Sequence, residues 1–446
     1  AAGGQAEAVD LTGTWVGLSC ITLFVVAYLF VMTEELTGMR KSQPVMLAAG
    51  LIWGLIALAY AQNGDAAAAE PALRAALEEY AELFLFLLTA MTYVNAMTER
   101  NVFEALRSRL ASRGFSYRQL FWTTGFIAFF LSPMLDNMTT ALVLAAVVLA
   151  VGVDSPRFVG LTCISIVVAA NAGGAYSPFG DITTLMVWQA GQLQFGEFFE
   201  LFGPALVNFL VPAALMHFAI PTAAPPPHEA RIAMKRGARR IMLLFALTVA
   251  TAVLLHNFLD LPPFLGMMMG MAYLQLFGYY LRKTHVPTPQ DRASYGEVGE
   301  VPAFDMYRHV ARAEWDTLLF FYGIILGVAG LGYLGYLAVS SDLLYTRLGP
   351  TFANTAIGLL SAVIDNIPIM AAVLHMNPAM SHQQWLLITL TAGVGGSLLS
   401  IGSAAGVALM GQAQGRYTFL THLRWTPAIA LGYAASILTH LWLNAG

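Results

Sequence analysis

The sequence predicts an all-α polytopic membrane protein: about ten transmembrane helices plus two re-entrant helical hairpins, in an inverted-topology repeat. Three observations lead to this prediction. Hydrophobic residues make up 58% of the 446-residue chain and charged residues only 11%, whereas soluble domains have about 25% charged residues. Apolar runs of the length that crosses a bilayer, about 20 residues, recur along the chain. A polar motif interrupts an apolar region once in each half.

Eight of the apolar runs are uninterrupted, and each is expected to form one transmembrane helix. These runs are 14–33, 45–61, 80–98, 198–219, 238–258, 262–282, 315–338 and 426–444. Two longer runs, 158–190 and 384–413, contain Gly, Ser and Asn and are expected to form helices broken inside the membrane. Two further regions, 119–152 and 351–376, are interrupted by Asp-Asn and Pro, and we interpret them as re-entrant hairpins.

The basic residues test this assignment independently, because Lys and Arg favour the cytoplasmic side of a membrane. With the N-terminus outside, the cytoplasmic segments contain every one of the 22 Lys and Arg residues except Arg74 and Arg347. Both termini are therefore predicted to be extracytoplasmic, with 1–13 as a short tail. The segment 220–237 is predicted to be a cytoplasmic linker. Whether a signal peptide preceded the tail stays open.

The two halves of the chain carry matching segments in the same order. The matching pairs are LSPMLDNMTT (131–140) with LSAVIDNIPI (360–369), and GGAYSPFGDITTLM (173–186) with GGSLLSIGSAAGVAL (395–409). We therefore assign a first repeat to 14–219 and a second repeat to 238–446. An odd number of crossings separates the two hairpins, so they are expected to enter from opposite sides. Such repeats bring broken helices together near the bilayer midplane in secondary transporters.

Several acidic residues lie within or at the edges of apolar runs that contain no basic residue. They are Glu82, Asp136, Asp181, Glu314, Asp316 and Asp365. A carboxylate at the bilayer centre costs about 3 kcal/mol unless it is paired, hydrated or protonated. Binding of a proton or of a metal cation would compensate for that cost. Two alternatives stay open, which are helix capping by the three aspartates of the breaks and an interfacial position for the other acids.

The residue types at the breaks favour a cation over an anion. Helix N-termini attract anions, but an aspartate at each hairpin tip and a third at position 181 would repel them. Asn137 and Asn366 follow the tip aspartates, and Thr183 and Thr184 follow Asp181. Such oxygen ligands suit hard cations, here Na⁺ or Li⁺. A carboxylate that binds either a proton or a cation can couple their movements.

The motifs DNMTT, NAGGAYSPFGDITT and DNIPIM, with AMTYVNAMTERNVFEALRSRL at 90–110, resemble the NhaD-type sodium/proton antiporters of the ion-transporter superfamily. The resemblance runs from about residue 80 to the end. It implies an inverted-repeat fold, elevator-like alternating access and a homodimer. It also implies an ion path that is lined by Asp136, Asn137, Asn171, Asp181, Thr183, Thr184, Ser361, Asp365, Asn366, Ser400 and Ser403. Asp136 and Asp181 are expected to be the main Na⁺ and proton ligands, with Glu82, Glu314 and Asp316 as accessory acids.

We therefore predict a secondary active transporter that exchanges Na⁺ or Li⁺ for H⁺ across a bacterial inner membrane. Its termini are expected to be periplasmic, and no cofactor is expected. The alternative is an anion transporter of the same superfamily, either a dicarboxylate symporter or an arsenite exporter. An intramembrane enzyme is disfavoured because the sequence has no GxSxG or HExxH motif. The net charge of −4 gives no support for a nucleic-acid partner. Stoichiometry and cation preference stay open.

Overall fold

The structure is a computed structural model, and its regular elements in the described residues are all helical. It describes residues 11–62, 67–223, 232–284, 304–413 and 415–444. Most of the predicted N-terminal tail and residues 224–231 of the predicted linker lie outside these ranges.

Nine helices of the described chain are long and apolar enough to cross a membrane. They are α1 (Trp15–Met32), α3 (Ser42–Gln62), α4 (Glu70–Glu99), α8 (Pro156–Gly174), the continuous Glu197–His217 helix (η1, Glu197–Leu201, and α10, Phe202–His217), α11 (Ala238–Leu259), α12 (Pro263–Lys283), α15 (Trp315–Tyr333) and α22 (Thr426–Leu443). These helices account for all eight predicted uninterrupted spans and for the first arm of the 158–190 run. The fold class is therefore confirmed as polytopic and all-helical.

One span differs from its prediction in length. The helix α4 begins at Glu70 rather than near residue 80, because residues 72–79 are mostly Ala, Leu and Glu, which are strong helix formers. Glu82 consequently lies inside α4, and its place relative to the membrane surface stays a prediction.

Contacts within the chain define two compact units, which we call the larger unit and the smaller unit. The larger unit contains 1–80, 107–230 and 319–446, and the smaller unit contains 81–106 and 231–318. Each unit therefore takes segments from both predicted repeats, so neither unit coincides with one repeat.

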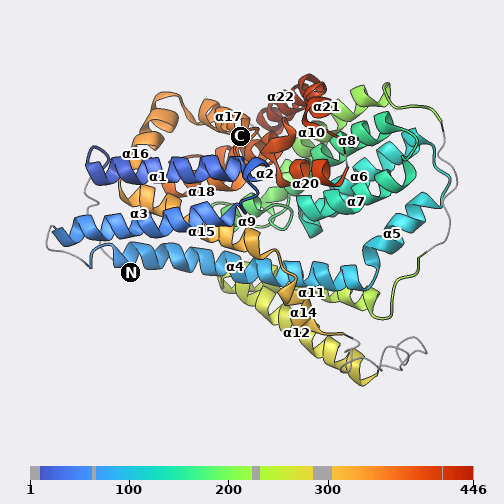
Figure 1. Cartoon of the computed structure of the whole chain (residues 1–446), viewed down its shortest axis with the longest axis horizontal. Helices are drawn as coiled ribbons and strands as arrows, with labels where there is room; N and C mark the ends of the chain where they lie inside the picture. The colour runs from blue at the N-terminus through green and yellow to red at the C-terminus, as the bar shows by residue number, and fades with distance from the viewer. Residues whose placement is uncertain (1–10, 63–66, 224–231, 285–303, 414, 445–446) are drawn as a thin grey trace. The chain divides into compact units, whose positions relative to one another are not determined.

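In the larger unit, the first predicted hairpin is a pair of helices that meet at Asp136. They are α6 (Tyr117–Leu135) and α7 (Asn137–Val151), and both pack against α8 (Figure 1). The two helices also contact each other, as expected for the hairpin that the sequence predicts. The chain after α8 is non-helical up to Asp181, where α9 (Ile182–Gln189) begins. Re-entry of the hairpin into a membrane stays a prediction.

The second half of the larger unit repeats this order of elements. The helices α17 (Pro350–Leu360) and α18 (Asn366–Met376) are separated by residues 361–365, and both contact α19 (His382–Gly395). After α19 the chain is interrupted until α20 (Ala404–Gln412), apart from the short turn η3 (Ser400–Gly402). The predicted interruptions at 158–190 and 384–413 therefore both occur.

Glycines at the two breaks allow equivalent close approaches of backbone to backbone. A Cβ atom on Gly173 would overlap the carbonyl group of Phe129 on α6, and one on Gly395 would overlap the carbonyl group of Gly358 on α17. Gly173 and Gly395 are matched in the sequence repeat, and so are Phe129 and Gly358. The packing of each hairpin's first helix on its broken helix is therefore the same in both repeats.

A hydrogen bond is repeated in the same way. The Ser132 hydroxyl donates to the Ala170 carbonyl over 2.6 Å, and the Ser361 hydroxyl donates to the Ala392 carbonyl over 2.9 Å. All four residues are buried. The internal repeat that the sequence predicts is thus expressed in side-chain contacts as well as in element order.

The smaller unit is built around the helices α11 and α12, which pack closely because Gly266 and Gly270 of α12 contact the backbone or side chain of α11. Tyr93 of α4 donates its hydroxyl to the Gly270 carbonyl over 2.6 Å, and Thr248 of α11 donates to the Tyr93 hydroxyl over 2.9 Å. These hydrogen bonds give the buried hydroxyl and carbonyl groups partners between otherwise apolar helices. The remaining short helices of the chain are α2 (Glu34–Thr37), α5 (Val102–Ala111), α14 (Met306–Ala311), α16 (Tyr336–Ser341), η2 (Asp342–Arg347) and α21 (Phe419–Leu423).

Candidate functional site

The carboxylate of Asp181 lies where both helix breaks of the larger unit converge. Asp181 is the N-cap of α9 and is only 6% exposed. Its Oδ1 accepts a hydrogen bond from the Thr183 amide over 3.3 Å. Its Oδ2 accepts two more, from the Asn137 side-chain amide over 3.1 Å and from the Asn366 side-chain amide over 2.9 Å. One oxygen atom is therefore bound from both hairpins.

The two asparagines that bind Asp181 are counterparts in the repeat, since each is the first residue of its hairpin's second helix. The Asn137 amide also donates to the side-chain oxygen of Asn171 on α8 over 3.1 Å. The second break carries Ser403 at the position that corresponds to Asp181, and its hydroxyl caps α20. The symmetric fold thus surrounds a single carboxylate with amides from both halves.

Other polar atoms near the first break are buried and have no hydrogen-bond partner among the described residues. They include the hydroxyl oxygens of Thr183 and Thr140 and the amide nitrogen of Asn171. A buried polar atom without a partner costs about 1–3 kcal/mol. In the described chain, no three His, Cys, Asp or Glu side chains come together as a metal site.

Asp136 acts as a helix cap, which is the alternative that the sequence left open. Its two carboxylate oxygens accept hydrogen bonds from the amide and the hydroxyl of Thr139, each over 2.8 Å. Its backbone has φ 76° and ψ 160°, a region that residues other than glycine rarely occupy. Strain of this kind is usually retained where a site requires it. Capping and a strained tip therefore coincide at Asp136.

Asp365 differs from Asp136 although the two occupy equivalent tips. Its backbone amide donates to the Tyr28 hydroxyl over 3.1 Å. The charge of Lys41, whose ammonium group lies 5.0 Å from the centre of the Phe320 ring, acts on the Asp365 carboxylate. The sequence did not predict a basic side chain near Asp365, and it assigned no functional residue to the first 75 positions. Tertiary packing supplies both Tyr28 and Lys41.

Three of the predicted hydroxyl groups are engaged with the backbone. Thr184 donates to the Ser177 carbonyl over 2.8 Å and to the Asp181 carbonyl over 2.7 Å. Ser361 donates to α19, and Ser403 caps α20, as described above. The hydroxyl of Ser400 is buried and lies beside that of Tyr417. These groups hold the breaks in shape in this conformation.

The three predicted accessory acids belong to the smaller unit, whereas all eleven predicted ion-path residues belong to the larger unit. Glu82 lies within α4, and Asp316 lies in the first turn of α15. Glu314 accepts a hydrogen bond from the Thr317 hydroxyl over 3.2 Å. The accessory acids and the ion-path residues therefore belong to different compact units.

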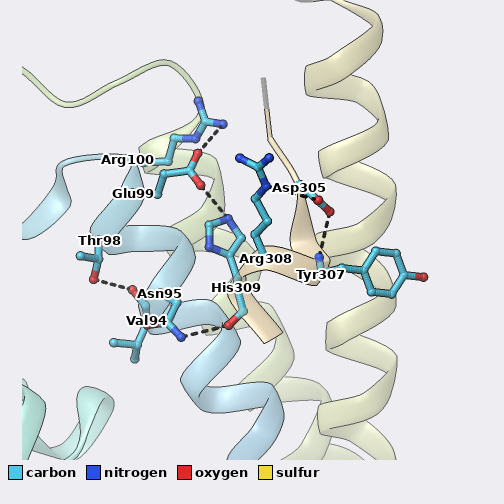
Figure 2. A network of polar contacts seen from close by, with 9 residues as sticks. All are labelled: Val94, Asn95, Thr98, Glu99, Arg100, Asp305, Tyr307, Arg308 and His309. Atoms are coloured by element: carbon cyan, nitrogen blue, oxygen red, sulfur yellow. Dashed lines mark hydrogen bonds and ion pairs between the residues drawn. The ribbon is translucent and has the colours of Figure 1, made fainter. Parts of the chain in front are cut away.

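The smaller unit also contains a polar network that sequence reasoning missed (Figure 2). The Glu99 carboxylate lies 3.2 Å from the Arg100 guanidinium and 3.1 Å from Nε2 of the fully buried His309. The Asn95 side chain donates to the His309 carbonyl over 3.1 Å. The network fastens α14 to the C-terminal end of α4. No local motif marks it, because His309 is more than 200 residues from Glu99 and Arg100 in sequence.

The fold and the site are those of a polytopic membrane protein of transporter type. It has apolar helices of membrane-crossing length, two interrupted helices with their hairpins, and a buried carboxylate that amides hold. Residues 12–393 match the CitMHS family, described as citrate transporter. The chain is 58% identical to the Na⁺/H⁺ antiporter NhaD of Alkalimonas amylolytica, over 99% of this chain and 93% of that protein. It is 55% identical to the Na⁺/H⁺ antiporter NhaD of Vibrio cholerae serotype O1, over 98% of this chain and 94% of that protein. Sodium/proton antiporter 1 of Arabidopsis thaliana is 32% identical, over 97% of this chain and 75% of that protein. The chain therefore belongs to the CitMHS family and to the NhaD-type antiporters.

Proposed function

We propose that this protein exchanges Na⁺ for H⁺ across the bacterial inner membrane, with Asp181 as the group for which the two cations compete. The observation that carries this proposal is the buried carboxylate of Asp181, which is bound by amides from both hairpin tips. The names of the NhaD relatives support the same exchange.

The geometry supplies a physical route to coupling. In this conformation Asn137 and Asn366 direct their N–H groups at Oδ2 of Asp181, which satisfies the charged carboxylate. A cation on the same oxygen would repel these N–H groups, so each amide would have to rotate and present its oxygen instead. Binding of a cation to Asp181 would then change the side-chain orientation of an asparagine in each of the two hairpins. A proton on Asp181 competes for the same lone pairs, so Na⁺ and H⁺ exclude one another.

The remaining ligands are proposed from the same breaks. The unpartnered Thr183 hydroxyl is two residues from Asp181, and Asn171 binds Asn137. Oxygen ligands of this kind serve Na⁺ and also Li⁺. Asp136 and Asp365, at the hairpin tips, are proposed as secondary acids of the path. Alternating access, periplasmic termini and a homodimer belong to the same proposal.

The family description names citrate, so an anion substrate is the second candidate. A citrate site would have to neutralise several negative charges. Among the described residues, however, no Lys or Arg side chain lies within 4 Å of the Asp181 carboxylate. A buried acid between two hairpins would repel a tricarboxylate. Thermal stabilisation of the purified protein distinguishes the two: we expect Na⁺ and Li⁺ to raise the melting temperature, and stabilisation by citrate, succinate or arsenite alone would favour an anion transporter.

Replacement of the carboxylates tests the proposal in proteoliposomes that contain a pH-sensitive dye. Asp181→Asn should abolish Na⁺-dependent proton movement, and Asp136→Asn should abolish or strongly reduce it, while both variants remain folded. Asp342→Asn is the matched control, because Asp342 pairs with Arg347 on an exposed surface of the same unit. Wild-type rates in Asp181→Asn would exclude Asp181 as the shared carrier.

A further inference from the structure

The segment that follows α20 contains two buried polar side chains that the proposed ion path does not use. Tyr417 is 1% exposed, and His422, on α21, is fully buried. Their ring centroids lie 5.9 Å apart. Burial of a phenol and an imidazole in an apolar protein is unfavourable unless each polar atom has a partner.

Both ring nitrogens of His422 have partners, and the partners determine where its proton lies. Nε2 lies 2.9 Å from the Ser397 carbonyl oxygen, and Nδ1 lies 2.8 Å from the Tyr417 hydroxyl oxygen. A carbonyl oxygen can only accept, so Nε2 carries the proton. In the neutral ring Nδ1 then accepts the hydrogen bond that the Tyr417 hydroxyl donates. Burial lowers the pKa of His422 to about 4, which keeps the ring neutral near pH 7.

Ser397 belongs to the second helix break, between the end of α19 at Gly395 and the turn that begins at Ser400. The next carbonyl, that of Leu398, accepts a hydrogen bond from the Thr426 hydroxyl over 2.9 Å. Two successive carbonyls of non-helical backbone are therefore held by side chains from 422–426. Non-helical backbone at membrane depth requires such partners.

The first break is held by a different arrangement. Tyr176 and Ser177, which lie within that break, donate their hydroxyls to the Phe129 and Pro133 carbonyls of α6, over 3.3 and 3.2 Å. The first break is thus attached to its own hairpin, whereas the second break is attached to the segment that leads into α22. The two halves of a symmetric fold are stabilised asymmetrically.

We infer that His422 is a positioning residue for the ion path, which fixes the Ser397 carbonyl and thereby the places of Ser400 and Ser403. The Tyr417 hydroxyl extends this contact, since it lies beside Ser400 as well as against His422. The inference rests on the proposed cation exchange, because Ser400 and Ser403 matter only if the second break contributes oxygens to the cation.

The test compares substitutions of His422 with those of a matched histidine. His422→Leu removes both hydrogen bonds, whereas His422→Gln keeps an amide donor for the Ser397 carbonyl. His440 is the control, because it is also buried in the larger unit and its Nε2 lies 2.9 Å from a backbone carbonyl, that of Gln383, at the far end of α19. Each variant is reconstituted, and Na⁺-dependent proton movement is measured over a range of Na⁺ concentrations.

We expect His422→Leu to raise the half-saturating Na⁺ concentration about tenfold. A tenfold change is the size expected for the free energy of about one buried hydrogen bond. His422→Gln should recover most of the wild-type value, and Tyr417→Phe should have an intermediate effect. His440→Leu should reduce thermal stability and leave half-saturation unchanged. An unchanged value in His422→Leu, or an equal rise in His440→Leu, would overturn the inference. Absence of exchange in the wild-type protein would instead refute the proposed function.

A second measurement needs no transported cation. A cysteine introduced as Ser400→Cys, with Cys20 and Cys163 replaced by Ala, reports on the break through its rate of alkylation. Addition of His422→Leu should increase that rate several-fold, because Ser400 is fully buried and depends on the attachment at Ser397. An identical rate in the two backgrounds would show that His422 does not position the break.

Discussion

The neutral His422 makes the stability of this protein depend on pH in a way that can be calculated. In an unfolded chain a histidine takes up a proton near pH 6.5, whereas burial lowers the pKa of folded His422 to about 4. Between these values the unfolded state binds more protons than the folded state. The free energy of unfolding therefore falls as the pH is lowered from about 6.5 to about 4.

The size of this effect follows from the shift. A pKa difference of about 2.5 corresponds to about 3 kcal/mol, of which about 2 kcal/mol is already lost at pH 5. Above pH 7 the contribution is complete and constant. His422→Gln contains no titratable group at this position and retains the donor to Ser397, so it should lose less stability on acidification than the wild-type protein.

Melting temperatures of the wild-type protein and of His422→Gln, measured in detergent from pH 5 to pH 8, provide the assay. All other titrating groups are common to both proteins and cancel in the difference. We expect the two melting curves to converge as the pH falls from 7 to 5. A stability difference that is the same at every pH would refute the assignment of a buried neutral imidazole.

Two further predictions concern packing and the network of the smaller unit. Gly173→Ala and Gly395→Ala should each destabilise the protein by about 1–3 kcal/mol, because the added methyl group meets a backbone carbonyl that cannot move freely. Gly50→Ala is the control, because a methyl group at that position meets no atom within 4 Å. Equal melting temperatures for the three variants would contradict the packing. His309→Leu should cost about 1–3 kcal/mol, because it removes the buried partner of a carboxylate. Arg74→Ala is the control, because it breaks an exposed ion pair with Glu70 and should change the free energy of unfolding by less than about 1 kcal/mol. A smaller loss of stability in His309→Leu than in Arg74→Ala would argue against the network.

The sequence alone was sufficient for the class of protein and for most of its elements. Apolar content and run length depend only on local composition, and a bilayer imposes a minimum length on each crossing helix. For the same reason the breaks were predictable, since Pro, Gly and Asx residues interrupt helices wherever they occur. The repeat was also visible, because Asn137 and Asn366 follow the same motif.

What the tertiary structure decided is which of these polar residues meet. Asn366 lies 185 residues from Asp181 along the chain, and no periodicity encodes that two amides bind one oxygen of a single carboxylate. The sequence motifs favoured Asp136 and Asp181 as the main acids, whereas packing placed amides from both halves on Asp181, gave Asp136 a cap and brought Lys41 into range of Asp365. The contact between His422 and the Ser397 carbonyl is likewise decided by packing and not by a local motif. A hydrophobic pattern specifies which face of a helix is buried, but only the assembled helices specify which buried polar atoms become partners.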